Sequence, residues 1–184
     1  VKALKKGSLE ETARKARLDF FLETAKRIKA DKIALGHTLD DQAETVLMRL
    51  LRGSGLLGLS GILPKRDIGG VTVIRPLLGI KRREIESFLK AKRIIPRVDA
   101  SNLDEAYFRN RIRHKLLPGL EKYNSNIKEV LAGSAENIAL DYDYLCASSL
   151  KIFKRLAQKT NSQRISLPSE KCLRLHPAIR NMLF

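Results

Sequence analysis

Four side chains that could perform acid–base or ligand chemistry lie within eight consecutive positions: His37, Asp40, Asp41 and Glu44. Asp41 and Glu44 are three residues apart, so on a helix they share one face. Two carboxylates on one face can hold Mg²⁺ or the ammonium group of a ligand, although acidic residues also occur at helix N-termini simply because the dipole favours them. His37 is compatible with a phosphate contact, a general base or a satisfied polar residue at a strand end. The clustering of all four favours a functional site.

The neighbouring residues predict the elements that would position this cluster. Residues 32–36 form a short apolar run that is typical of a buried strand. The acidic pair after it predicts a helix over residues 42–52, and a capping-box pattern that begins at Ser8 predicts a helix over residues 8–30. A helix, a strand and a helix in this order are half of a doubly wound α/β unit with a parallel sheet. Ligands of such sheets bind beyond the carboxyl ends of the strands, where the cluster lies.

The rest of the chain predicts a second, helical part. A further strand is expected at residues 71–75, and helices are expected at residues 81–93, 105–117 and 126–159. Pro118 and Gly119 are expected to stop the basic helix before them, so we place a domain boundary there, between an α/β part (residues 1–118) and an all-α part (residues 119–184). The Gly-rich residues 53–61 fit neither GxxxxGK[ST] nor a GxGxxG between strand and helix, which favours a mobile or substrate-contacting loop.

The charge balance indicates a polyanionic partner. The chain of 184 residues carries 36 Lys and Arg against 20 Asp and Glu, a formal net charge of +16. This favours nucleic acid over the alternative of a lysine-rich surface without a specific partner. Aromatic residues make up 5% of the chain and Trp is absent, so base-stacking platforms are poorly supported. Contacts from Lys and Arg to phosphates are the expected mode of binding.

Composition also argues against several classes of protein. The sequence contains no apolar run of about 18 residues, the length that a transmembrane helix needs, and its first residues lack the pattern of a signal peptide. Its two cysteines, Cys146 and Cys172, are too few for a disulfide framework and too far apart for a CxxC pair. We therefore expect a cytoplasmic protein without a membrane partner.

Several ordered blocks of the sequence resemble the tRNA(Ile)-lysidine synthetases, which are PP-loop or N-type ATP pyrophosphatases. In chain order the blocks are residues 37–45 (HTLDDQAET), 50–56 (LLRGSGL), 75–78 (RPLL) with the basic helix that follows, and 108–113 (FRNRIR). The likeness covers most of residues 1–120 and extends more weakly into the helical part, which it implies is a truncated tRNA- or substrate-binding domain. Thr38 stands where relatives often carry a second His, and Leu18 where an aromatic residue is common.

The resemblance implies an adenine-nucleotide α-hydrolase-like fold and an ATP-dependent carbon–nitrogen ligase. Such an enzyme uses ATP and Mg²⁺ to adenylate the C2 oxygen of the wobble cytidine in an isoleucine tRNA with a CAU anticodon. The side-chain amine of free lysine then displaces AMP and forms lysidine, and pyrophosphate is the other product. The implied partners are therefore tRNA(Ile), lysine and ATP, and a homodimer is a further expectation.

The same resemblance implies roles for particular residues. His37, Asp41 and Glu44 are the expected catalytic residues, with His37 near the phosphates or the reacting base, and the two carboxylates on the lysine ammonium or, at Asp41, on Mg²⁺. The expected substrate- and tRNA-binding residues are Arg17, Arg109, Asn110 and Arg113. If Ile112 faces the core, a 3.6-residue period predicts that Arg109 lies near the buried boundary and that Arg111 and Arg113 are more exposed.

One block of the family is missing. The ATP-binding loop Ser-Gly-Gly-x-Asp-Ser occurs nowhere in this sequence, so no residue here is assigned to it, and the chain is expected to be a fragment that could be inactive by itself. Two alternatives stay open. One is a non-catalytic tRNA-binding fragment. The other is a PP-loop tRNA 2-thiolation enzyme, which also adenylates a pyrimidine C2 but carries CxxC cysteines that this chain lacks.

Overall fold

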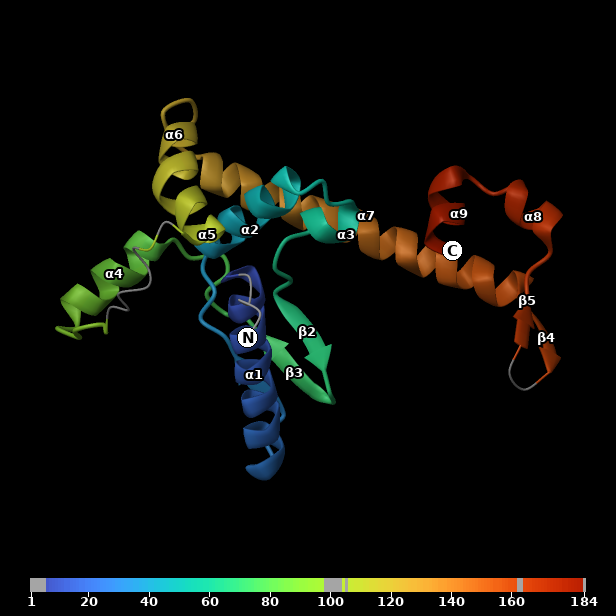
Figure 1. Ribbon diagram of the computed structural model, residues 1–184, viewed down its shortest axis with the longest axis horizontal. Helices are drawn as coiled ribbons and strands as arrows, with labels where there is room; N and C mark the ends of the chain where they lie inside the picture. The colour runs from blue at the N-terminus through green and yellow to red at the C-terminus, as the bar shows by residue number, and fades with distance from the viewer. Residues whose placement is uncertain (1–5, 98–103, 105, 162–163, 184) are drawn as a thin grey trace.

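The computed structural model describes residues 6–97, 104, 106–161 and 164–183. Figure 1 shows an α/β part from which a long helix leads to a small C-terminal unit. The α/β part contains α1 (Lys6–Arg27), β1 (Lys32–Ala34), α2 (Leu39–Leu51), α3 (Leu56–Leu59), β2 (Lys65–Ile68), β3 (Val71–Ile74) and α4 (Arg82–Ala91). There follow α5 (Phe108–Arg111), the π-helical turn η2 (Ile112–Leu116), α6 (Leu117–Glu121), α7 (Ile127–Leu156), β4 (Gln158–Asn161), β5 (Arg164–Ser166), α8 (Ser169–Leu173) and α9 (Pro177–Leu183). The predicted α/β class is confirmed.

The larger sheet has the strand order β1-β3-β2. β1 pairs with β3 in parallel, with Ile33 opposite Val73, as expected for this class. β2 pairs with β3 antiparallel through a two-residue turn at Gly69 and Gly70, whose φ angles of 58° and 82° favour glycine. Sequence reasoning missed β2 because three of its four residues are charged and exposed, although the Gly-Gly pair before a β-branched run is itself a hairpin signal.

The hydrophobic core lies between α2, the α5–α6 segment and α7. Its buried side chains are Ala43 and Leu47 of α2, Ile112 of η2 and Leu117 of α6, and Ile127 and Leu131 of α7 pack against them. The β-branched and aliphatic residues that face this space bury apolar surface that would otherwise contact water. The core therefore joins α2 to the helices that follow it, and it extends across the predicted boundary between residues 118 and 119, which stays a prediction.

Several predictions about the elements were wrong. Helical structure continues through Pro118 and Gly119 as α6, since Pro is tolerated in the first turn of a helix, where its missing N–H has no helix partner. α1 begins at Lys6, so Ser8 lies inside its first turn and not at its cap. Where only helical structure was expected, β4 and β5 form an antiparallel hairpin.

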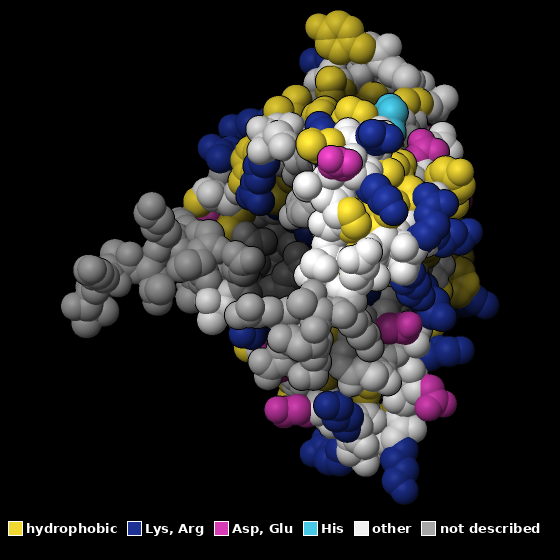
Figure 2. Space-filling view, turned by 90° about the vertical axis from the view of Figure 1, so that its right-hand side faces the viewer, with side chains coloured by type: hydrophobic (Ala, Val, Ile, Leu, Met, Phe, Trp, Pro, Cys, Tyr) yellow, Lys and Arg dark blue, Asp and Glu magenta, His cyan; other side chains and the backbone are white. Residues whose placement is uncertain are grey.

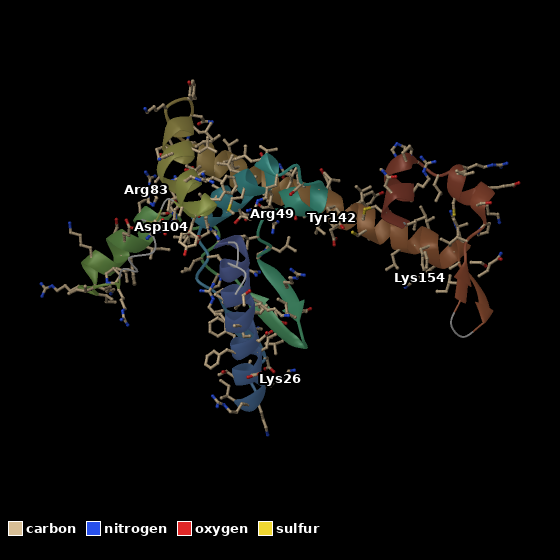
Figure 3. The ribbon with its side chains drawn as sticks, viewed as in Figure 1. Lys26, Arg49, Arg83, Asp104, Tyr142 and Lys154 are labelled. Atoms are coloured by element: carbon tan, nitrogen blue, oxygen red, sulfur yellow. The ribbon has the colours of Figure 1, made fainter. Side chains whose placement is uncertain are left out.

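Basic side chains are spread over well separated elements. Lys26 near the end of α1, Arg83 on α4 and Lys154 near the end of α7 are all exposed (Figure 3). Figure 2 shows Lys and Arg side chains recurring over the described part of one face, with acidic side chains sparse among them. Such a surface suits contacts with many phosphates. Within the described ranges, no helix has both the length and the apolar character needed to cross a membrane.

Candidate functional site

The first turn of α2 follows β1 after a short connection, and the cap of this helix fixes the Asp41 side chain. Thr38 is the N-cap residue, and its hydroxyl oxygen accepts a hydrogen bond from the Asp41 backbone N–H. The Asp41 carboxylate accepts in return from the Thr38 backbone N–H at 2.9 Å and from its hydroxyl at 3.0 Å. This capping box starts α2 at Leu39, three residues before the predicted start at Gln42, because a Thr cap satisfies the first free N–H groups.

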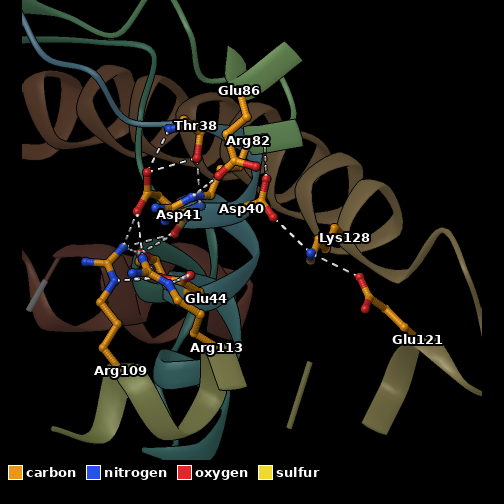
Figure 4. Close-up of polar contacts among 11 residues, drawn as sticks. Thr38, Asp40, Asp41, Glu44, Arg82, Glu86, Arg109, Arg113, Glu121 and Lys128 are labelled. Carbon is orange, nitrogen blue, oxygen red and sulfur yellow. Dashed lines mark hydrogen bonds and ion pairs between the residues drawn. The ribbon is translucent and has the colours of Figure 1, made fainter. Parts of the chain in front are cut away.

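Asp41 and Glu44 share one face of α2, as their spacing predicts, and two arginines face them (Figure 4). Arg109 Nε donates to Glu44 Oε2 at 2.7 Å, and its Nη2 lies 3.3 Å from Asp41 Oδ1. Arg113 Nε donates to Glu44 Oε1 at 2.6 Å, and its Nη2 donates to Oε2 at 3.0 Å. Two carboxylates and two guanidiniums thus form a charge-balanced cluster, which we call the Glu44 cluster.

The burial of the Glu44 cluster is uneven. The Glu44 side chain is 1% exposed, whereas the side chains of Arg109 and Arg113 are 28% and 21% exposed. Burial lowers the pKa of Arg113, but its hydrogen bonds and charge contacts with Glu44 and the nearby Asp41 outweigh this and raise the pKa above its ordinary value. The Glu44 carboxylate is therefore sealed inside the protein, whereas both guanidiniums and the Asp41 side chain, which is 22% exposed, reach its surface.

The structure confirms two of the three predicted arginine orientations. Arg109 is half-buried and Arg111 is exposed, as predicted. The prediction that the Arg113 side chain is more exposed than that of Arg109 was wrong. The two residues are four positions apart, so on an α-helix they lie about 40° apart and reach the same carboxylate.

Two other predicted binding residues lie apart from the cluster. Asn110 is 6% exposed, and its amide donates to the backbone oxygen of Asp104 at 2.9 Å, so it supports the segment before α5. The expectation that Asn110 binds substrate stays a prediction. Arg17 is exposed on α1 and makes none of the cluster's contacts.

The predicted Mg²⁺ ligand does not fit a metal site. Both Asp41 oxygens accept from protein donors, and those of Glu44 face the two guanidiniums at hydrogen-bond distance. A cation would have to displace these donors, and the guanidiniums would repel it. Among the residues that the structure describes, no group of three or more His, Cys, Asp or Glu could hold a metal ion. We therefore assign no metal ligand in this chain.

His37 and Arg75 follow the two parallel strands at the same edge of the sheet. Arg75 Nε donates to His37 Nδ1 at 3.3 Å, and its Nη1 donates to the Leu63 backbone oxygen at 2.6 Å. Sequence reasoning noticed Arg75 only as part of a motif. Its place directly after the strand that neighbours β1 is the signal that could have assigned it to the site.

Asp40 joins α2 to two other helices. Its carboxylate accepts from the backbone N–H of Arg82 at the start of α4 and from the Lys128 ammonium on α7 at 2.9 Å, and Lys128 also contacts Glu121. Burial acts to raise the pKa of Asp40, but these hydrogen bonds outweigh it and hold the pKa below its ordinary value. Lys128, whose pKa burial lowers, has a raised pKa through the same two carboxylates. Sequence reasoning missed Lys128.

The Gly-rich loop after α2 has a structural role. Arg49 Nη1 donates to the backbone oxygens of Gly58 and Gly61, each at 2.7 Å, and Gln42 Oε1 accepts from the backbone N–H of Ile62 at 2.6 Å. α2 therefore holds the loop through its own side chains. The expected loop contains the short helix α3, which sequence reasoning missed, and a contact with substrate stays a prediction.

Comparison with known proteins places this arrangement in a family. The PP-loop domain matches residues 1–120. The tRNA(Ile)-lysidine synthase of Clostridioides difficile (strain 630) is 41% identical over 174 residues, which are 94% of this chain and 37% of the relative. That of Symbiobacterium thermophilum is 49% identical over 132 residues, 71% of this chain and 27% of the relative. The chain thus spans about a third of the length of these relatives.

A solved structure shares the fold. The U34-tRNA thiolase NcsA from Methanococcus maripaludis, solved with its 4Fe-4S cluster, is similar with a TM-score of 0.53 at 23% identity. The similarity covers 75% of this chain and 45% of that protein, and it bears on the fold alone. The resemblance inferred from the motifs is confirmed by these matches, and the chain belongs to the PP-loop domain family.

Proposed function

We propose that this chain is part of a tRNA(Ile)-lysidine synthase, an ATP-dependent ligase that attaches lysine to C2 of the wobble cytidine of tRNA(Ile). The observation that carries the proposal is the Glu44 cluster at the first turn of α2, formed by residues of two motif blocks that are 65 positions apart. The matches to relatives that bear this name support it. The net charge of +16 suits a tRNA substrate.

In this proposal the arginines face the substrate. Arg109 and Arg113 each donate hydrogen bonds from Nε and Nη2 to the carboxylates. Among the described residues, the Nη1 group of neither arginine has a hydrogen-bond partner. Figure 4 shows the outer amino group of Arg109 pointing away from the carboxylates. Fixed guanidinium donors of this kind stabilise the charge that develops on phosphate and pyrimidine oxygens during adenylation.

The proposal changes the expected role of the carboxylates. Asp41 and Glu44 were expected to hold the ammonium group of lysine, and this stays a prediction. Because both are already paired with arginines, we propose that they act by orienting Arg109 and Arg113. The ATP-binding loop and the ligands of the Mg²⁺ that accompanies ATP are not assigned to residues of this chain.

A hybrid enzyme tests the proposal. The segment of the Clostridioides difficile relative that matches this chain is replaced by this chain, and the hybrid is incubated with ATP, lysine and a tRNA(Ile) transcript with a CAU anticodon. Nucleoside mass spectrometry then measures lysidine. We expect lysidine that depends on ATP and lysine. A folded hybrid that binds this tRNA but forms no lysidine would contradict the proposal and favour the non-catalytic alternative.

A further inference from the structure

Arg75 holds His37 from the neighbouring strand. β1 and β3 run in parallel, and Ala34 and Ile74 are paired at the carboxyl ends of the two strands. His37 and Arg75, which follow these ends, therefore lie at the edge of the sheet where α/β proteins bind ligands. The Arg75 guanidinium spans two acceptors, the Leu63 backbone oxygen at 2.6 Å and His37 Nδ1 at 3.3 Å. Both residues are half-buried.

The chemistry of the pair fixes the proton on the imidazole. A guanidinium has only N–H donors and keeps its charge at all physiological pH values. The ring nitrogen that accepts from Arg75 must therefore carry a lone pair, which leaves the proton of the neutral ring on Nε2.

We infer that Arg75 is a positioning residue that holds His37 as the neutral tautomer with its proton on Nε2. His37 then acts as a hydrogen-bond donor at Nε2 and not as a general base. Of the roles that the sequence left open for His37, this favours a contact with phosphate over a general base. The role in the reaction rests on the proposed function, whereas the tautomer is a property of this chain.

Nuclear magnetic resonance of this chain, labelled with ¹⁵N in its histidines, tests the tautomer directly. The sequence contains three histidines, and a His37→Gln variant identifies the signals of His37. We expect long-range ¹H–¹⁵N correlations at pH 7.5 that show His37 with an unprotonated Nδ1 and a protonated Nε2. A protonated Nδ1 in the wild-type chain would overturn the inference.

Variants of Arg75 show whether this residue is the cause. Arg75→Ala is expected to give a mixture of the two tautomers, and Arg75→Lys, which keeps the charge but loses the planar fork, is expected to restore the single tautomer only in part. Arg66→Ala removes an exposed arginine from β2 of the same sheet and is the matched control, with no expected change. An unchanged His37 spectrum in folded Arg75→Ala would overturn the inference.

A double-mutant cycle in the hybrid enzyme tests the consequence for catalysis. Misplacing a substrate-facing group by about 1 Å can cost 100-fold in rate, so Arg75→Ala is expected to lower kcat by about 10- to 100-fold with little change in KM for tRNA. Because Arg75 acts through His37, adding Arg75→Ala to His37→Gln should cause no further loss. Fully additive losses would overturn the inference. A wild-type hybrid without activity would instead contradict the proposed function, and the tautomer measurement would still stand.

Discussion

Glu44 is a buried carboxylate that faces two guanidiniums, and this makes it a residue of the fold as well as of the site. Replacing it with Ala would leave Arg109 and Arg113 without their main counter-charge. Removing one partner of a buried ion pair costs about 3–5 kcal/mol, so we expect Glu44→Ala to lower the free energy of unfolding by that amount in urea denaturation. Glu86→Ala removes an exposed pair with Arg82 and is the control, with a change below about 0.5 kcal/mol. Equal, small effects at both positions would contradict the buried cluster.

The lowered pKa of Asp40 predicts how the free energy of unfolding depends on pH. Its pKa in the folded protein lies below its ordinary value of 3.8, so its contribution is fully present above about pH 4 and is lost as the pH falls through the folded-state pKa. Asp40→Asn should therefore lower the free energy of unfolding by about 2 kcal/mol at pH 7, and the difference from the wild type should shrink towards pH 2. Asp19→Asn, which changes an exposed residue of α1, is the control. A difference that stays constant from pH 7 to pH 2 would contradict the role of the Asp40 charge.

At this scale, the sequence could indicate residue types but not all of their partners. The three-residue spacing of Asp41 and Glu44 was enough to place them on one face. Arg75 could not be paired with His37 in advance, because the two are 38 positions apart and meet only when β1 and β3 align. Lys128 was missed for the same reason, since it reaches Asp40 from α7.

At the scale of the elements, the stability of the protein depends on the contact between α2 and the Gly-rich loop of residues 53–61. Gly61 has a φ of 64°, and a Cβ atom added there would lie 2.6–2.8 Å from the side-chain amide of Gln42. Gly61→Ala combines an unfavourable backbone conformation with this clash, and we expect a loss of about 2 kcal/mol in the free energy of unfolding. Gly55→Ala is the matched control, because nothing lies within 4 Å of its added Cβ. A similar stability for the two variants in thermal and urea unfolding would contradict this account of the loop.

Elements with a strong apolar pattern could be predicted, and those with a polar one could not. The apolar run at β1 and the β-branched run at β3 were both found as strands. The expectation that the first of them is buried was wrong, because Lys32 and Ala34 of β1 are exposed, whereas Val71 and Val73 of β3 are buried. β2 is charged and lies at the sheet edge, where its side chains face water, so its pattern resembles a loop. The continuation of helix through Pro118 was missed because Pro stops a helix interior but not a first turn.

Over the whole molecule, the net charge of +16 makes a prediction about tRNA binding. If about 5–8 phosphates are neutralised by Lys and Arg, the logarithm of the binding constant should fall against the logarithm of salt concentration with a slope of about −4 to −7. Filter binding of this chain to tRNA(Ile) between 50 and about 300 mM KCl measures the slope. A slope near zero would mean that the charge has no part in tRNA binding.

The central claim is that the Glu44 cluster presents Arg109 to the reacting groups, whereas Arg111 only belongs to the basic surface. The most direct measurement is the single-turnover rate of lysidine formation by the hybrid enzyme at saturating tRNA. We expect Arg109→Ala to lower it by about 100-fold or more and Arg109→Lys to recover only part of it, because Lys lacks the planar fork. Arg111→Ala should keep the rate within about twofold and reduce the salt slope by about 0.9, the effect of one phosphate contact. Equal losses at the two positions, appearing only as weaker tRNA binding, would contradict the account.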